Sequence, residues 1–132
     1  MNIRRSASGH SDTVTALIGA IEARGLTVFA RIDHAAGARA AGLTLADEEV
    51  VIFGNARAGT PLMAADARIG IELPLRILVW RDNEVVLVGY HDPRELSAEY
   101  DVAEHRATLE QMATLLDALA TAAAATPPAA AG

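Results

Sequence analysis

The spacing of apolar residues near the start of the chain predicts a long amphipathic helix. Within residues 14–21, four apolar side chains stand at positions i, i+3, i+4 and i+7, so they share one stripe of a helix. We expect this helix to cover residues 12–24. Ser11 or Asp12 would cap its first turn, and Gly25 would end it in the left-handed conformation.

Capping residues and a second apolar stripe predict the remaining helices. Aspartate, threonine and first-turn proline are typical of helix starts, and the apolar stripe lies within residues 109–119. The helices expected are 35–41, capped by Asp33 and stopped by Gly42; 61–67, begun by Thr60-Pro61; 93–99, begun by Asp92-Pro93; and a C-terminal helix that follows Asp101 and lasts to about residue 123.

Alternating and continuous apolar runs predict five strands. They cover residues 2–7, 26–33, 49–53, 73–81 and 84–90. The run 49–53 is apolar on both faces, as expected for an interior strand. The dipeptide Asp82-Asn83 is a two-residue hairpin signal, so the last two strands should be antiparallel neighbours. The order of elements predicts an α+β fold: a single antiparallel sheet of about five strands with helices on one face.

Composition limits the class of protein and its partners. A chain of 132 residues without cysteine is long enough for one core without disulfides or thiolate metal sites, and it fits a cytoplasmic location. The net charge of −6 opposes nucleic-acid binding, which requires basic surface. The start of the chain lacks the apolar run of a signal peptide, and no apolar segment is long enough to span a membrane. We therefore expect neither a nucleic-acid nor a membrane partner.

The chain divides into a folded domain and a tail. We expect residues 1–124 to form the domain. Residues 125–132 contain alanine and proline with no large apolar side chain, and such a segment buries too little surface to offset its ordering entropy. It is therefore predicted to be disordered.

Four spaced motifs resemble those of the DUF302 family of uncharacterised bacterial and archaeal proteins. They are VFARIDHA (28–35), IFGN (52–55), GTPLM (59–63) and LPLRILVW (73–80), within a similarity that covers about residues 8–116. The resemblance implies a TBP-like α+β fold with the order β-α-β4-α and implies no established activity. Ala56, Glu72 and Arg76 stand where the family often has proline, aspartate and lysine. The change at Ala56 weakens the expectation of a rigid loop after Asn55.

The residues give little support to catalysis or metal binding. The four histidines form no HxH, HxxxH or HExxH spacing, so no metal site is expected. The glycines match neither GxGxxG nor a P-loop. No acid-base pair or activated nucleophile is complete. We therefore name no catalytic residue and no cofactor, and an enzyme is the least supported class.

A small-molecule site is expected where the strand 49–53 turns at Gly54-Asn55. Asn55 offers a donor and an acceptor, and amides at the Thr60-Pro61 helix start would favour an anion. The ligand would then be small and polar or anionic. The candidate ligand-binding residues are His34, Asn55, Thr60, Met63, Trp80 and Tyr90.

Each candidate also has a purely structural interpretation. His34 would pack in the first turn of the helix that Asp33 caps, Asn55 and Thr60 would satisfy their own loop, and the large side chains would fill the core. The alternative to ligand binding is therefore a structural or interaction module that acts through homodimerisation, and a homodimer is expected because two-fold dimers are the commonest oligomers.

Overall fold

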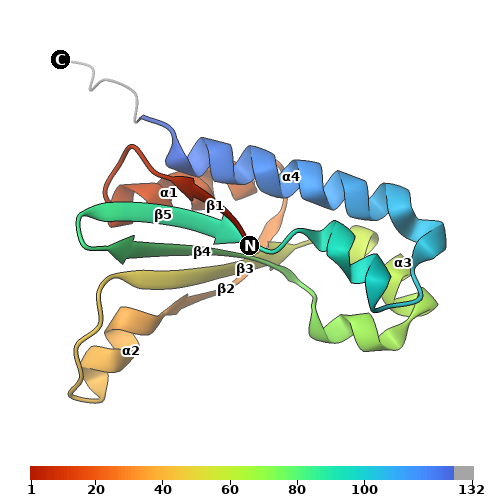
Figure 1. The fold of residues 1–132 in the computed structure, drawn as a ribbon, viewed down its shortest axis with the longest axis horizontal. Helices are drawn as coiled ribbons and strands as arrows, with labels where there is room; N and C mark the ends of the chain where they lie inside the picture. The colour runs from red at the N-terminus through yellow and green to blue at the C-terminus, as the bar shows by residue number, and fades with distance from the viewer. Residues whose placement is uncertain (127–132) are drawn as a thin grey trace.

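Two long helices lie on one face of a five-stranded antiparallel sheet in the computed structural model, which describes residues 1–126 (Figure 1). The strands are β1 (Asn2–Arg5), β2 (Thr27–Asp33), β3 (Glu48–Gly54), β4 (Leu75–Asp82) and β5 (Val85–Tyr90). The α-helices are α1 (His10–Ala23), α2 (His34–Ala40), α3 (Ala56–Ala65) and α4 (Arg106–Ala124). Short 3-10 helices are η1 (Ala67–Ile71), η2 (Pro93–Ala98) and η3 (Ala103–His105).

The sheet has the strand order β1-β5-β4-β3-β2, and every neighbouring pair is antiparallel. β4 is therefore central and β1 lies at an edge. Without the short helices the order along the chain is β-α-β-β-β-β-α, as the sequence predicts. Asp82 pairs with Val85, so the hairpin loop is one residue later than expected. Asn83 has a φ of 55° there, which asparagine tolerates well.

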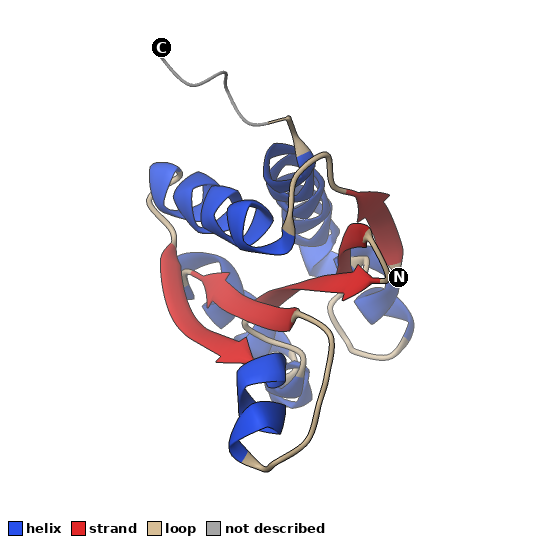
Figure 2. Cartoon of the chain, turned by 90° about the vertical axis from the view of Figure 1, so that its left-hand side faces the viewer, coloured by secondary structure: helices blue, strands red, loops and turns tan. Residues whose placement is uncertain are grey.

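Alternation along the strands divides the sheet into a helix-covered face and an open face. Val51 and Phe53 of β3 and Ile77 and Val79 of β4 point toward α1 and α4, and all four are fully buried. They pack with Leu17, Ile21, Leu116 and Leu119, which come from the two predicted helical stripes. The short helix α2 lies on the other side of the sheet, beyond the end of β2 (Figure 2).

A second, smaller core lies beyond one end of the sheet, under the short helices. It joins α3, η1, the segment around η2 and the first turns of α4. Its buried members are Leu62, Ile69, Tyr100, Val102, Leu109 and Met112. This cluster fixes α3 and η1 against the rest of the domain, because few other contacts reach these helices.

Several predicted caps differ from the structure. α1 begins at His10 after Gly9, and no side chain caps it, so the assignment of Ser11 or Asp12 is wrong. The hydroxyl of Thr13 instead donates to the Gly9 carbonyl at 2.8 Å. Asp101 does not cap α4 either, because η3 intervenes. The N-cap is the residue at the helix start whose backbone is not yet helical. Tertiary contacts can move this position by two or three residues.

The start of α3 also differs from the prediction. The helix begins at Ala56, and the carboxamide oxygen of Asn55 accepts a hydrogen bond from the Ala58 N–H at 3.0 Å. Thr60 is therefore not a cap, and Pro61 lies inside the helix. Asparagine is at least as good an N-cap as threonine. Pro61 lies on the exposed side of the helix, where the loss of the one backbone hydrogen bond that proline removes is tolerated.

Other local predictions are confirmed. Asp33 caps α2 by accepting from the Ala36 N–H at 2.8 Å. Gly25 and Gly42 have φ values of 72° and 78°, the left-handed conformation that favours glycine. The helix α4 ends at Ala124, one residue after the predicted end at about residue 123. Most of the predicted tail, residues 127–132, lies outside the described residues.

Candidate functional site

The six predicted ligand-binding residues do not share one site. Asn55, Thr60 and Met63 line a cavity under α3. His34 and Tyr90 line a second hollow, which shares only Leu75 with the first. Trp80 lines neither cavity. Its ring lies on the open face of the sheet against Gly89, where an added Cβ would be 3.0 Å from the ring. The expectation that His34 and Asn55 meet at one strand end is wrong: β2 and β3 are antiparallel, so the residues that follow them lie at opposite ends.

The cavity under α3, here called the α3 pocket, has a volume of about 290 Å³. It lies where β3 ends and α3 begins, and α4 closes one side. Its lining is almost wholly apolar. The larger lining side chains are Leu26, Phe29, Phe53, Met63, Leu73, Pro74, Leu75, Met112 and Leu115.

Two glycines keep the α3 pocket open. A Cβ added at Gly59 would lie 3.6 Å from Leu73 Cδ1 and 3.7 Å from Met63 Cε, so the missing side chain leaves space beside two lining residues. Gly54 has a φ of 153°, a conformation in which other residues are strained. It lets the chain turn from β3 into α3 close to Phe29 and Pro74.

Aromatic and thioether side chains form the mouth and floor of the pocket. Phe29 stands at a register shift of β2, between the paired residues Val28 and Ala30, and is 54% exposed. A bulge of this kind redirects a side chain. Met63 is 38% exposed, while Phe53 at the floor is fully buried. The pocket is therefore open to solvent at Phe29 and Met63 and closed at the core.

Polar groups are few in the α3 pocket. The Asn55 carboxamide oxygen is occupied by its cap, but the amide nitrogen has no hydrogen-bond partner among residues 1–126. The Thr60 hydroxyl has none in the same part of the chain. Asn55 and Thr60 are both exposed and lie at the rim. The pocket therefore offers an apolar body and one or two hydrogen-bonding groups at its edge.

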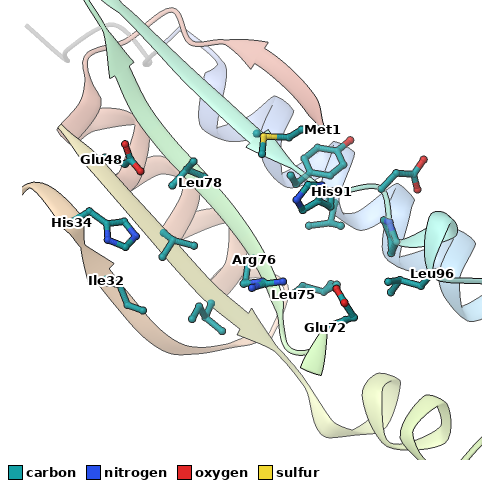
Figure 3. Close-up of a pocket in the computed structure, with 17 residues that line it drawn as sticks. Met1, Ile32, His34, Glu48, Glu72, Leu75, Arg76, Leu78, His91 and Leu96 are labelled. Carbon is teal, nitrogen blue, oxygen red and sulfur yellow. The ribbon is translucent and has the colours of Figure 1, made fainter. Parts of the chain in front are cut away.

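The second hollow, here called the sheet trough, has a volume of about 430 Å³. It lies along the open face of the sheet and continues at one end toward η2 and α4, where Leu75, Leu96 and Leu116 line it. Strand residues Ile32, Val50, Ile52 and Leu78 form its base. Figure 3 shows Glu48 and His34 at one end, Leu78 near the middle, and Arg76 and Glu72 toward the other end. The charged groups therefore stand at opposite ends of an apolar base.

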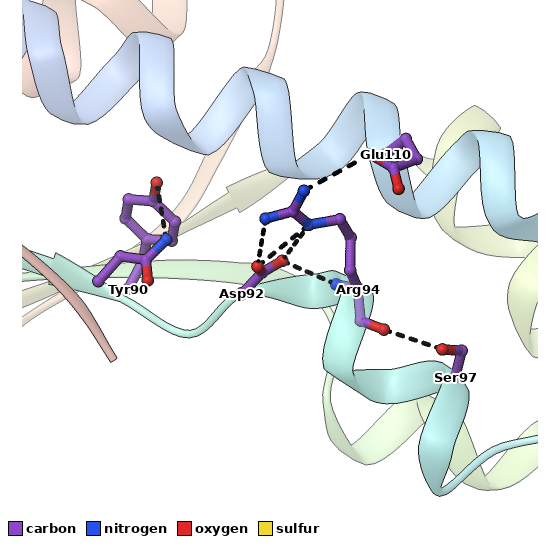
Figure 4. A network of polar contacts seen from close by, with 6 residues as sticks. Tyr90, Asp92, Arg94, Ser97 and Glu110 are labelled. Carbon is purple, nitrogen blue, oxygen red and sulfur yellow. Dashed lines mark hydrogen bonds and ion pairs between the residues drawn. The ribbon is translucent and has the colours of Figure 1, made fainter.

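Beside the trough, a carboxylate holds η2 in place. Asp92 caps η2 and accepts two-pronged hydrogen bonds from the Arg94 guanidinium, the shortest at 2.6 Å. Arg94 also lies 3.7 Å from Glu110 of α4 (Figure 4). The hydrogen bonds from Arg94 lower the pKa of Asp92. Arg94 thus pairs with carboxylates of η2 and α4, so this network attaches η2 to the domain.

Asp66 organises the segment between α3 and η3. Its carboxylate accepts from the backbone and guanidinium of Arg68 and from the Asp101 N–H. The side chain of Asp66 is 8% exposed and that of Arg68 is 67% exposed. Hydrogen bonding from Arg68, followed by the Asp101 N–H, holds the pKa of Asp66 far below its ordinary value of 3.8.

We expect Asp66→Asn to flatten the acid side of the stability profile. Because folding lowers the pKa of Asp66, the ionised group stabilises the fold above pH 3.8, and this contribution is lost as the pH falls below that value. The melting temperature of wild type should therefore fall more steeply below pH 3.8 than that of the variant. Arg68→Met, which removes the largest cause of the shift, should resemble Asp66→Asn. Parallel profiles for all three proteins would contradict the linkage.

Sequence reasoning missed most of the α3 pocket. Phe29, Leu73, Met112 and Leu115 come from separate parts of the chain, and nothing in their local spacing marks them as neighbours. Gly59 gave no signal either, because the helix predicted from the sequence begins at residue 61, and only the structure places this glycine inside α3. Among residues 1–126, no group of three histidine, cysteine, aspartate or glutamate side chains is placed to hold a metal ion.

A solved structure has the same fold as this chain. The crystal structure of an uncharacterized conserved DUF302 protein from Bacillus stearothermophilus superposes with a TM-score of 0.83 over 92% of this chain and 96% of that one, at 15% identity. This likeness is one of fold, and it extends over nearly the whole of both chains.

Two relatives are longer than this chain. Proteins of Brucella suis biovar 1 (strain 1330) and Brucella abortus biovar 1 (strain 9-941), both named fluoride-specific ion channel FluC 1, are 39% identical to it over 98 residues. The match covers 72% of this chain but 39% and 36% of theirs. The chain thus spans about two fifths of these relatives, and no helix in its described residues has the length and apolar character to cross a membrane.

The family is settled by a match along nearly the whole folded domain. The model of the family described as "Domain of unknown function DUF302" matches residues 2–120, which run from β1 into the last turns of α4. This chain therefore belongs to the DUF302 family.

Proposed function

We propose that this domain binds a small, mainly apolar molecule in the α3 pocket. The observation that carries the proposal is an apolar cavity of about 290 Å³ that opens at Phe29 and Met63 and ends on the buried core. Small-molecule sites are usually concave and apolar, with a few polar groups that fix orientation. The expected position at the Gly54-Asn55 turn is retained in this proposal, and the ligand class changes from polar or anionic to apolar.

The size and rim of the pocket define the ligand further. A cavity of about 150 Å³ holds benzene, so the α3 pocket has room for roughly two fused rings or a short branched chain. The Asn55 amide nitrogen donates, which favours a carbonyl, hydroxyl or ring oxygen at one end of the ligand. Met63 has a flexible thioether that adapts its shape to different ligands. The proposed class is therefore an apolar bicyclic or branched molecule with one acceptor group.

We expect 2-naphthol and similar two-ring probes to raise the melting temperature of wild type, and Gly59→Leu to remove the effect. A ligand at about 100 times its Kd stabilises the folded state by about 2.7 kcal/mol. The leucine side chain at position 59 would extend from a Cβ that already lies 3.6 Å from Leu73 and would fill the cavity. A thermal-shift titration measures the change in both proteins.

Gly19→Leu supplies the matched control for this experiment. Gly19 also lies inside a helix, and a Cβ added there meets no atom within 4 Å. Both variants gain helix propensity, but only Gly59→Leu enters the pocket. Equal probe-induced shifts in the two variants would place binding elsewhere, for example in the sheet trough. The absence of any shift in wild type across a series of two-ring probes would contradict the proposed ligand class.

A second candidate function is favoured by the Brucella relatives. Their names refer to a fluoride channel, and this chain matches about two fifths of each. We infer that the domain accompanies fluoride transport as an extramembrane module, in which case the small polar or anionic ligand expected from the sequence would be fluoride. Thermal shifts in sodium fluoride and sodium chloride at equal ionic strength test direct binding. A shift specific to fluoride supports this candidate, and equal shifts in the two salts contradict it.

A further inference from the structure

The open face of the sheet is apolar although no helix covers its centre. Along β2, β3, β4 and β5 the residues that point away from α1 and α4 include Ile32, Val50, Ile52, Leu78, Trp80 and Leu87. Ile3 on β1 and the preceding Met1 extend the surface, at 56% and 59% exposure. An antiparallel sheet with one face in water normally carries polar residues there. A contiguous apolar face of this kind marks an interaction surface.

We propose that this open face packs against the same face of a second copy of the chain, across a two-fold axis. The placement of two charges favours a second copy as the occupant. Glu48 pairs in register with Trp80, and Arg76 pairs with Ile52, so the two charged residues lie four positions apart along neighbouring strands. They stand at opposite ends of the trough, with the Val50–Leu78 pair midway between them. Glu72 also lies toward the Arg76 end, where its carboxylate accepts a hydrogen bond from the Tyr100 hydroxyl at 3.1 Å.

The two charges complement each other only between copies. A two-fold axis that lies between two facing sheets, across the strands and over Val50 and Leu78, exchanges the two ends of the trough. Glu48 of one copy then faces the end that holds Arg76 of the other, and the reverse pair forms by symmetry. Interfaces with two-fold symmetry are self-complementary in this way. Within residues 1–126, neither Glu48 nor Arg76 forms an ion pair.

The charge of the chain also opposes a membrane as the occupant of this face. The formal net charge is −6, and the face itself contains glutamate as well as arginine. Anionic lipid surfaces attract clustered lysine and arginine, which this face lacks. The dimer would enclose the two troughs in one interface, with His34 beside Glu48 at each end. The site that His34 and Tyr90 line would then be composed of residues from both copies.

Charge-reversal variants test this arrangement. Glu48→Arg leaves each chain with an arginine at both ends of the trough, and Arg76→Glu leaves each chain with a glutamate at both ends. In either homodimer both cross-pairs become repulsive, and like charges in contact oppose association strongly. We expect each variant alone to associate about tenfold more weakly than wild type. Sedimentation velocity measures the dissociation constant, and circular dichroism shows that each variant stays folded.

Mixing the two variants gives the decisive result. In the mixed dimer the introduced arginine faces the introduced glutamate, and the native Arg76 of one chain faces the native Glu48 of the other. Both cross-pairs are restored, so an equimolar mixture should dimerise as wild type does. A monomeric wild type, or a mixture that associates no better than its separate components, would overturn the proposal.

Two further variants test whether the open face, and not another part of the surface, forms the interface. Leu78→Glu, at the centre of the face, should be monomeric and folded. Glu22→Arg, an exposed position of α1 outside the trough, should dimerise as wild type does. A Leu78→Glu variant that stays dimeric would also overturn the proposal, because the interface would then lie elsewhere.

Discussion

Replacing Phe53 with alanine should lower the free energy of unfolding by about 3–5 kcal/mol. The Phe53 ring is fully buried among the residues that join the sheet to α1 and α4. It also forms the floor of the α3 pocket. The truncation removes the transfer free energy of the ring and leaves a cavity that neighbouring strands, fixed by hydrogen bonds, fill only in part. Since domains are commonly stable by about 5–15 kcal/mol, the loss is a large fraction of the total.

Urea denaturation of wild type, Phe53→Ala and Phe53→Leu measures this effect. Phe53→Leu keeps an apolar side chain of intermediate size and should lose much less stability. The slope of the free energy against urea concentration should stay unchanged, because it reports the surface exposed on unfolding. A loss below about 1 kcal/mol for Phe53→Ala, the usual size for an ordinary substitution, would show that Phe53 is not part of the rigid core.

The regular elements were predictable because their signals are local. The stripe within residues 14–21 and the alternation in the strands specify which side faces the core, whatever lies opposite. Asp33 as a cap and Gly25 as a helix end are confirmed for the same reason. The error at Thr60 arises because Asn55 and Thr60-Pro61 are both good start signals. The earlier one is used, since the Asn55 carboxamide accepts from the Ala58 N–H.

The candidate sites were less predictable because they are made by long-range contacts. The α3 pocket joins Phe29, Leu73 and Met112, which lie on β2, the segment before β4, and α4. The direction of β2 then separates His34 from Asn55 by the length of the sheet. The grouping of the six candidates into one site was therefore wrong, and a ligand-binding role for any of them stays a prediction.

The strand 49–53 shows how one pattern has two interpretations. Apolar residues on both sides of β3 predict an interior strand, and β3 lies between β2 and β4. Only one of its faces is covered, however, since Val51 and Phe53 are fully buried and Val50 and Ile52 remain partly exposed. Apolar residues on both sides of a strand normally indicate that both sides are buried. In this chain the second side is buried only if something packs on the open face. The second copy proposed above supplies that cover.

Replacing Leu62 with alanine should release α3 and lower the free energy of unfolding by about 2–5 kcal/mol. Leu62 is fully buried and is the one buried residue of α3, so the helix has no other large buried side chain to hold it on the domain. Its partners include Ile69 of η1 and Leu109 of α4. Because isolated helices shorter than about 12 residues are marginally stable in water, loss of this anchor should destabilise the whole of α3.

Hydrogen exchange distinguishes local release from a uniform loss of stability. In Leu62→Ala we expect faster exchange in α3 and η1, residues 56–71, while the strands β3, β4 and β5 exchange at rates set by global unfolding. Leu62→Met nearly conserves volume and should cost less than about 1.5 kcal/mol, with protection of α3 retained. The same release removes one wall of the α3 pocket, so Leu62→Ala should also lose the response to two-ring probes. Uniformly faster exchange across sheet and helices would instead show that the small core and the sheet core unfold as one unit, and that α3 is not a separately mobile wall of the pocket.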